Sequence, residues 1–190
     1  MKIGLFFGSF NPIHNGHLAI SRFMVENEAI DQLWFVVSPQ NPFKIKDDLL
    51  SDNERLIMVN LAIKDESRFK SCEIEFNLPK PSYTINTLTV LSEKYPNEEF
   101  IIIMGADNFV QLNKWKDYEI LIREYRFLIY PRPEFDLSNL DRKEKFTLVN
   151  SPLMEISSSS IRKAISERRD VRDLLSHNVF QYINEMNLYR

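Results

Sequence analysis

The stretch Lys2-Ile-Gly-Leu-Phe-Phe-Gly-Ser-Phe-Asn-Pro-Ile-His-Asn-Gly-His17 decides the fold of this chain. Its first residues, up to Phe7, are apolar on both faces, which is typical of a central strand in a parallel sheet. Gly8 and Gly16 then bracket a turn, in which glycine permits a positive φ and a proline blocks the strand ladder. From His17 onward apolar residues recur at nearly helical spacing. The sequence therefore predicts a strand, a glycine-bracketed turn and a helix.

His14 and His17 stand where this helix is expected to start, and free amides and the positive end of a helix dipole favour phosphate there. Packing of both rings in a loop is one interpretation. A zinc site is a weaker one, because it needs three or four ligands and only Cys72 and His177 remain as thiol or imidazole partners. The third interpretation is phosphate chemistry, in which imidazole groups donate to oxygens whose charge shifts during transfer. Neither G-x-x-x-x-G-K-[ST] nor G-x-G-x-x-G follows the strand, which disfavours a Walker-type NTPase and a standard dinucleotide fingerprint.

Composition indicates one globular domain over residues 1–190, with 44% hydrophobic and 27% charged residues. A net charge of −3 does not indicate a broad positively charged surface for nucleic acid. An anionic substrate would therefore need a local cluster of donors. No apolar run is long enough to span a membrane and no signal-peptide pattern is present. With Cys72 as the single cysteine, no internal disulfide can form and a cytoplasmic location is expected.

Further apolar segments alternate with helical ones along the chain, which predicts an α/β fold with a mostly parallel sheet and helices on both faces. Ligands of such sheets bind at the carboxyl ends of the strands, where the histidines, Lys44, Gly105 and Arg132 should gather. Helices are expected over about 51–64, 82–95 and 158–190, the last packing on the domain. The other expected strands are Leu33–Val37, Cys72–Phe76, Phe100–Met104, Phe127–Tyr130 and Phe146–Val149.

A second informative stretch is Glu155-Ile-Ser-Ser-Ser-Ser-Ile-Arg162. Four serines in a row are typical of a flexible linker. An isoleucine anchors each side, however, and an amphipathic helical pattern continues beyond them. Serines at a helix start supply hydroxyls and free amides, and Arg162 adds a planar fork of donors for phosphate oxygens.

Three other residues have both an ordinary and a functional interpretation. Asp107 follows a strand that ends in Gly105, so it is either a helix N-cap or a carboxylate for ribose hydroxyls, and the two roles are compatible. Trp115 is either a core residue or a platform for a flat ligand. Lys44 is either a solvated lysine or a phosphate ligand.

The two stretches together resemble the HxGH nucleotidyltransferases, which transfer an adenylyl or cytidylyl group from a nucleoside triphosphate. Residues 8–17 are similar to the signature G-x-F-x-P-x-H-x-G-H, and residues 156–162 to I-S-S-T-x-I-R with Ser159 in place of threonine. Family members commonly have glycine, threonine and aspartate at the places of Phe7, Ser9 and Asn11. The resemblance implies a Rossmann-like sheet of the HUP nucleotidyltransferase type.

Within this superfamily, the middle of the chain resembles the bacterial nicotinate-nucleotide adenylyltransferases. The similar segments are Pro81–Leu88, Ile103–Asn108 with Trp115, and Tyr130–Pro133. This implies transfer of AMP from ATP to nicotinate mononucleotide, giving deamido-NAD and pyrophosphate. Pantetheine-phosphate adenylyltransferase is the alternative within the superfamily, since it shares the first motif and the serine-rich region. A nucleotide-sensing module that has lost catalysis is the alternative from another class.

The resemblance implies that Mg²⁺ is carried by ATP rather than by a protein cage, and homo-oligomerisation is left open. It also implies roles for individual residues. The implied catalytic residues are His14, His17, Lys44 and Arg162. The implied ATP-binding residues are Gly8, Ser9, Phe10, His17, Gly105, Asp107, Ile156, Ser157, Ser158 and Arg162. The implied residues for nicotinate mononucleotide are Lys44, Tyr83, Thr84, Trp115, Lys116 and Arg132.

Overall fold

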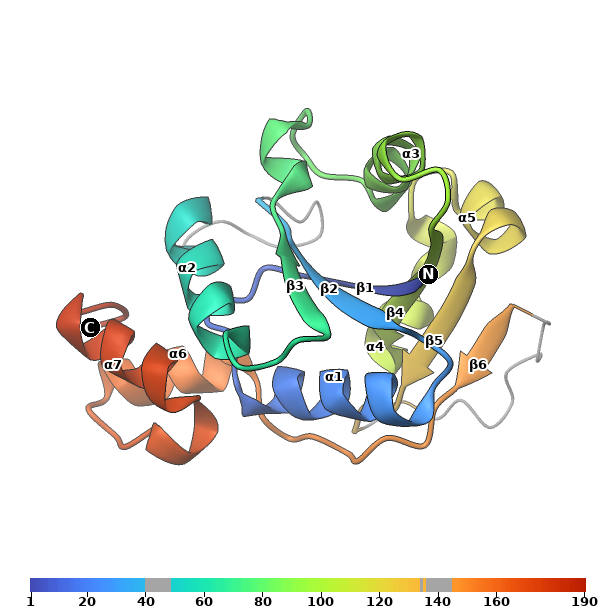
Figure 1. The fold of residues 1–190 in the computed structure, drawn as a ribbon. Coiled ribbons are helices and arrows are strands. Elements are labelled where there is room, and N and C mark those ends of the chain that lie inside the picture. The colour runs from blue at the N-terminus through green and yellow to red at the C-terminus, as the bar shows by residue number, and fades with distance from the viewer. Residues whose placement is uncertain (40–48, 134, 136–144) are drawn as a thin grey trace.

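The computed structural model describes residues 1–39, 49–133, 135 and 145–190, in which strands and helices largely alternate (Figure 1). The strands are β1 (Lys2–Gly8), β2 (Gln32–Val37), β3 (Phe69–Cys72), β4 (Glu99–Gly105), β5 (Arg126–Tyr130) and β6 (Phe146–Leu148). The α-helices are α1 (Asn15–Asn27), α2 (Asp52–Ile63), α3 (Thr84–Lys94), α4 (Ala106–Phe109), α5 (Tyr118–Glu124), α6 (Ser158–Ser166) and α7 (His177–Glu185). Short 3₁₀ helices are η1 (Ile74–Asn77), η2 (Leu112–Lys114) and η3 (Arg172–Leu174).

The strands form one sheet in the order β3-β2-β1-β4-β5-β6, and all of its pairings are parallel. The chain winds outward in one direction from β1 and in the other direction from β4. This reversal is the topological switch point of a Rossmann-like sheet, where ligands bind beyond the carboxyl ends of the strands. The structure confirms the predicted α/β fold.

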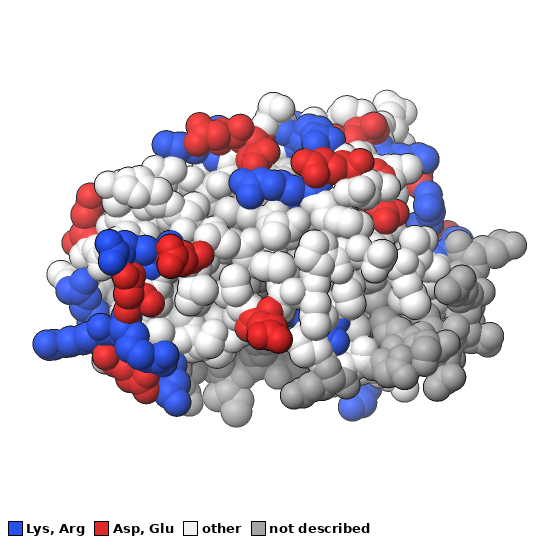
Figure 2. All heavy atoms as spheres, turned by 90° about the horizontal axis from the view of Figure 1, so that it is seen from below, with Lys and Arg blue, Asp and Glu red and all other residues white. Residues whose placement is uncertain are grey.

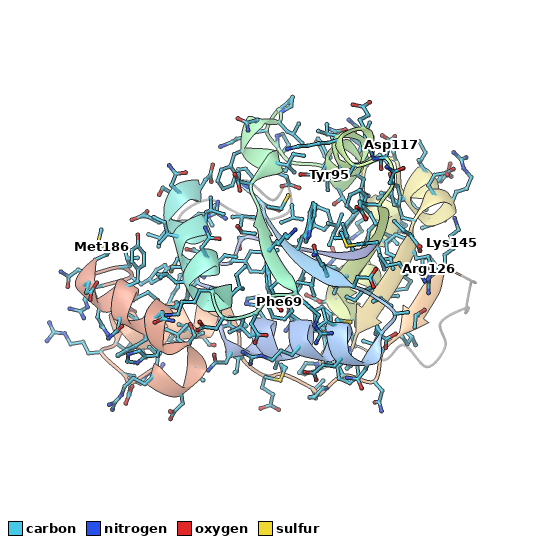
Figure 3. All side chains as sticks on the ribbon, in the orientation of Figure 1. Phe69, Tyr95, Asp117, Arg126, Lys145 and Met186 are labelled. Carbon is cyan, nitrogen blue, oxygen red and sulfur yellow. The ribbon has the colours of Figure 1, made fainter. Side chains whose placement is uncertain are left out.

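Helices cover both faces of the sheet and enclose two apolar cores. Helices α1, α2, α6 and α7 pack on one face and α3 and α5 on the other. Figure 1 shows α1 below the sheet and α3 and α5 above it. Phe69 belongs to the first core and Tyr95 packs against the second (Figure 3). In β4, Ile101 contributes to the first core and Ile102 to the second. Burial on both faces of the sheet explains why the sequence of β4 is an almost uninterrupted apolar run.

The surface of the face seen in Figure 2 carries charges of both signs, interspersed mainly around its rim. On the described part of that face, no large patch of one sign is visible. An anionic ligand that binds on this face therefore depends on local donors.

Among the helices described by the structure, none is both long and apolar enough to cross a membrane.

The strand predicted for Cys72–Phe76 is wrong. Strand β3 ends at Cys72, which is paired with Val36 of β2. The chain then turns into η1, whose N–H groups donate to carbonyls three residues earlier. An alternation of side chains cannot distinguish these two conformations over so few residues. The turn directs Glu75 inward, where it is 1% exposed.

Gly8 and Gly16, which bracket the turn, do not have the positive φ that glycine permits. In this turn the positive φ belongs to Phe10, at 47°, and none of the chain's four glycines has one. Close packing is the role that the structure gives to Gly8 and Gly16. A Cβ on Gly8 would lie 2.9 Å from Cζ of Phe10, and one on Gly16 would lie 3.0 Å from Nδ1 of His14.

The last part of the chain returns to the turn after β1. Asn15 donates from Nδ2 to the carbonyl of Asp173 at 2.9 Å and to that of Leu175 at 3.3 Å. The hydroxyl of Tyr189 donates to Oδ1 of Asn11 at 2.7 Å. The C-terminal residues thus fix the turn that carries both histidines.

Arg55 of α2 joins the turn after β1 to the end of β2. Its side chain is fully buried. Nη1 donates to the carbonyls of Ser9 at 2.5 Å and Ser38 at 2.9 Å, Nε donates to that of Leu50 at 3.1 Å, and Nη2 pairs with Asp52 at 2.6 Å. Burial lowers the pKa of the guanidinium, although the carboxylate of Asp52 opposes this. One cation therefore satisfies several backbone acceptors at the sheet edge where ligands bind.

Replacement of Arg55 by methionine should lower the free energy of unfolding by about 3 to 5 kcal/mol, because its partners would remain buried without a donor. Arg22→Met is the matched control, since Arg22 also pairs with a carboxylate, Glu66, but is 49% exposed. The control should lose only about 0 to 1 kcal/mol. Urea denaturation measures both losses. Equal losses would contradict the structural role of Arg55.

Candidate active site

His14 and His17 lie side by side at the start of α1. The helix begins at Asn15, so His14 is its N-cap and His17 lies in its first turn. The two imidazole rings stack with centroids 3.7 Å apart and planes inclined by 27°. The predicted meeting of both histidines with a helix start is confirmed, and the helix begins two residues earlier than expected.

A backbone hydrogen bond selects the tautomer of His17. The N–H of His14 donates to Nδ1 of His17 at 3.3 Å. A neutral imidazole that accepts at Nδ1 carries its proton on Nε2. The side chain of His17 is only half-buried. His17 is therefore arranged as a hydrogen-bond donor through Nε2.

His14 is an almost fully buried neutral base, with 4% of its surface exposed. Burial, followed by the positive charge of Arg132, lowers the pKa of His14 from 6.5 to about 3. Its Nδ1 has no hydrogen-bond partner among the described residues. Gly16 leaves the space that this ring occupies, as shown above. His14 hence stays uncharged at neutral pH.

The serine-rich motif lies against the same turn. Oγ of Ser158 donates to the carbonyl of Pro12 at 2.9 Å, across 146 positions of sequence. Nη1 of Arg162 donates to the carbonyl of Asn11 at 3.0 Å. Ser157 caps α6 by accepting from the N–H of Ser160 at 3.1 Å. The two sequence motifs thus form one surface, in which helix α6 presents its N-terminus beside the histidines.

The ends of β4 and β5 bring two other predicted residues together. Nε of Arg132 lies 3.6 Å from Oδ1 of Asp107, in a half-exposed ion pair. A Cβ on Gly105 would collide with Asp107 and lie 3.1 Å from Arg132. Arg132 also donates from Nη2 to the hydroxyl of Tyr130 at 3.3 Å, and burial raises the pKa of Tyr130 to about 12. Gly105 is therefore needed where this pair approaches the backbone.

A cavity of about 90 Å³ opens between the ends of β1 and β4 and the start of α3. The predicted acceptor residues Tyr83, Thr84, Trp115 and Lys116 all line it. Nζ of Lys116 lies 5.0 Å from the centroid of the Tyr83 ring, within cation–π range. The other lining residues are Phe6, Phe7, Gly8, Ser38, Glu75, Ser82, Ile102, Ile103, Met104, Gly105, Asn108 and Tyr130.

Some predicted residues are placed differently. Phe10 is 2% exposed and its ring contacts those of Phe6, Phe35 and His17 in the core, so any contact with ATP would have to come from its backbone. Ile156 lies beside Gly16. Lys44 lies outside the described residues.

Sequence reasoning missed Arg55 and Glu75. Both are buried, Arg55 beneath the turn after β1 and Glu75 in the cavity wall. In a sequence, an isolated charged residue is indistinguishable from the solvated ones around it. Only the capping box that opens α2, Ser51 with Glu54, indicated the helix on which Arg55 lies. Within the described part of the chain, no group of three or more His, Cys, Asp and Glu side chains could hold a metal ion.

Comparison with known proteins identifies the family. The cytidylyltransferase-like family model matches residues 5–164. A protein of Flavobacterium psychrophilum named "Probable nicotinate-nucleotide adenylyltransferase" is 46% identical over 192 residues, which cover 100% of both chains. One of the same name from Bacteroides thetaiotaomicron is 46% identical over 97% of this chain and 92% of its own. This chain belongs to the nicotinate-nucleotide adenylyltransferase family.

A solved structure agrees with this membership. Plasmodium falciparum nicotinic acid mononucleotide adenylyltransferase, complexed with NaAD, superimposes with a TM-score of 0.84 at 26% identity. The match covers 99% of this chain and 97% of that one. The nicotinate-nucleotide adenylyltransferase fold therefore extends over nearly the whole chain, C-terminal helices included.

Because His14 is neutral in the folded chain of this nicotinate-nucleotide adenylyltransferase family member, we expect the free energy of unfolding to depend on pH. The pKa of His14 is 6.5 in the unfolded chain and about 3 in the folded chain. Between these pH values His14 is protonated in the unfolded chain but not in the folded one. Stability should therefore fall as the pH drops through this window, by about 1.4 kcal/mol per unit from this residue. His14→Asn should remove that slope, so urea denaturation at pH 5 and pH 7 should show a difference of about 2 kcal/mol between wild type and variant. His177→Asn, at an exposed position, should keep the wild-type slope. Identical slopes in all three proteins would refute the buried neutral state.

Proposed function

We propose that this chain transfers AMP from ATP to nicotinate mononucleotide, giving deamido-NAD and pyrophosphate. The observation that carries this proposal is the junction of the two motifs. Hydrogen bonds from Ser158 and Arg162 hold the start of α6 against the histidine-bearing turn, beside a cavity lined by Trp115 and Thr84. Both motifs therefore meet at one site, next to the aromatic cavity.

The reaction requires alignment and charge stabilisation more than a base. The acceptor phosphate is already nucleophilic at neutral pH. One of its oxygens would form a bond to the α-phosphorus, while the bond to the bridging oxygen breaks and pyrophosphate leaves with the electron pair. No covalent enzyme intermediate is needed. The protein therefore contributes mainly by positioning donors around the phosphates.

Donors for the phosphates come from both motifs. We assign Nε2 of His17 to an oxygen of the α-phosphate and place His14 beside it, stacked and uncharged. The half-buried Arg162 suits the leaving pyrophosphate, because its remaining N–H groups can bind oxygens in pairs. Ser157 and Ser158 would add contacts at the start of α6, and Lys44 is proposed to assist them. ATP is expected to arrive as its magnesium complex, since Mg²⁺ keeps much of its coordination for phosphate and water.

The adenosine of ATP and the acceptor nucleotide would occupy the rest of the site. Gly8, Ser9 and Gly105 would let the adenosine of ATP approach the backbone, and Asp107 would accept from its ribose hydroxyls. The indole of Trp115 would stack on the nicotinate ring, and Thr84 together with backbone amides near Trp115 would bind its carboxylate. Tyr83, Lys116 and Arg132 are assigned to the same acceptor. A cytoplasmic location stays a prediction, and the oligomeric state stays open.

Removal of the His17 donor should lower turnover at least ~10²-fold in a folded protein, the usual loss for one donor to a transition state. His177→Ala is the control, because that histidine is exposed on α7, outside the site. Turnover is measured as pyrophosphate release at saturating ATP. Wild-type turnover in a folded His17→Ala protein would remove His17 from the catalytic group. No pyrophosphate release by wild type with any acceptor would favour the nucleotide-sensing alternative.

The acceptor itself is tested by comparing nicotinate mononucleotide, nicotinamide mononucleotide and phosphopantetheine in this assay. One charge-assisted hydrogen bond to the carboxylate should favour the first over the second by roughly ten- to a hundredfold in kcat/KM. Trp115→Ala should raise the KM of both pyridine nucleotides and largely spare that of ATP. Equal efficiency with both pyridine nucleotides would contradict the specificity, and activity with phosphopantetheine alone would establish pantetheine-phosphate adenylyltransferase activity instead.

A further inference from the structure

A buried phenol forms part of the wall of the acceptor cavity, and none of the substrate contacts proposed above uses it. Tyr130 is the last residue of β5, and its side chain is 3% exposed. It is one of the residues that line the cavity. Its ring contacts that of Phe6 edge-on with centroids 5.8 Å apart, and Phe6 contacts the ring of His17 at the same centroid distance. Phe6 therefore links the ring of Tyr130 to the histidine that we assign to the α-phosphate.

The hydroxyl of Tyr130 accepts a hydrogen bond, but its own proton has no acceptor among the described residues. Nη2 of Arg132 donates to Oη of Tyr130 at 3.3 Å, and this is the hydrogen bond that the described residues make with the hydroxyl. A phenolic hydroxyl has one proton to donate as well as an oxygen that accepts. Buried polar groups in proteins generally find partners. The unused proton, in the wall of a cavity, is therefore suited to a ligand oxygen.

The surroundings of Tyr130 favour an anionic oxygen as this partner. Burial raises the pKa of Tyr130 to about 12, although the charge of Arg132 opposes this, so the hydroxyl keeps its proton at neutral pH. The guanidinium of Arg132 lies beside the phenol, with Cζ 5.1 Å from the ring centroid. Asp107 lies on the Nε side of that guanidinium, 3.6 Å away, which leaves the Nη groups for a ligand. A cationic donor and a neutral donor thus lie together, and both form stronger hydrogen bonds with an anion than with a neutral group.

The position of the histidines indicates which anionic group these donors bind. The charge of Arg132 helps to lower the pKa of His14, so the guanidinium acts directly on that ring. His14 in turn stacks on His17, the proposed donor to the α-phosphate. In the proposed reaction the phosphate of the acceptor has to meet the α-phosphorus, and its carboxylate lies at the other end of the molecule, near Trp115. The phosphate is therefore the anionic group expected between the histidines and Tyr130.

We propose that Tyr130 binds the phosphate of the acceptor: its hydroxyl, held by Arg132, donates to a phosphate oxygen as that group approaches the α-phosphorus. The inference rests on the proposed function and adds a residue that its assignments do not include. Because the hydroxyl binds the phosphate and not the pyridine ring, it serves nicotinate and nicotinamide mononucleotides alike. It contributes nothing to the binding of a nucleoside that lacks the phosphate.

Replacement of Tyr130 by phenylalanine tests this assignment, because it keeps the ring that packs against Phe6 and removes the hydroxyl. Calorimetry in the absence of ATP measures the Kd of each acceptor. The Kd values of nicotinate and nicotinamide mononucleotide should both rise roughly ten- to a hundredfold, the loss of one charge-assisted hydrogen bond. The Kd values of nicotinate riboside, which has no phosphate, and of ATP should stay unchanged. Tyr125→Phe is the matched control, since the hydroxyl of Tyr125 lies 3.5 Å from that of Ser92, outside the cavity.

A loss of the same size for nicotinate riboside or for ATP would overturn the inference, and so would unchanged Kd values for both mononucleotides. Arg132→Met separates the hydroxyl from its effect on the guanidinium. In that background Tyr130→Phe should still raise the Kd of nicotinate mononucleotide, because the hydroxyl itself donates, and the absence of a further rise would also overturn the inference. If the losses depend on the phosphate as expected but wild type releases no pyrophosphate with any acceptor, the proposed function fails and this inference stands.

Discussion

The buried guanidinium of Arg55 is the interaction on which the ligand-binding edge of the sheet depends. Parallel strands end with backbone carbonyls that have no ladder partner, and at this edge they also lie beneath a crevice. Arg55 binds the carbonyls of Ser9 and Ser38, which follow β1 and β2, and its own position is fixed by Asp52 in the first turn of α2. A single side chain thus sets the relative positions of two strand ends. The turn that carries the histidines begins from one of them.

The same turn is held from its other side by the C-terminal part of the chain. Tyr189 donates to the side chain of Asn11 and Arg162 to its carbonyl, while Ser158 binds the carbonyl of Pro12. The contacts from Ser158 and Arg162 place the start of α6 beside the histidine-bearing turn, where we propose that the phosphates bind. Because the turn is held from both sides, His17 can present Nε2 without rearrangement. Donors held in place before the reaction stabilise developing charge more effectively than donors that must first reorient.

Much of the fold could be predicted because the strands are buried on both faces. A continuous apolar run such as Phe100–Met104 has few alternatives, and the proline and glycine positions delimit it. The motif residues could be predicted because serine is a common N-cap and because both motifs resemble those of a known family. Glu75 and Arg55 could not, since the sequence does not show which charged residues the fold buries. The residues after Cys72 were misassigned to a strand because alternating side chains do not distinguish a short strand from the 3₁₀ helix that the structure has at Ile74–Asn77.

The ionisable groups around the site limit the cost of buried charge in more than one way. Ionised groups inside a protein are costly unless they are paired, and anionic substrates add charge of their own. Lys116, which lines the cavity, is exposed, and Arg132 beside Tyr130 is half-exposed, so solvent reduces the cost of their charge. Burial favours the neutral forms of His14 and Glu75. Arg55 is also buried, and the carboxylate of Asp52 stabilises its charge. A neutral group can line a cavity before the substrate arrives, and binding of an anion then requires no change in its protonation.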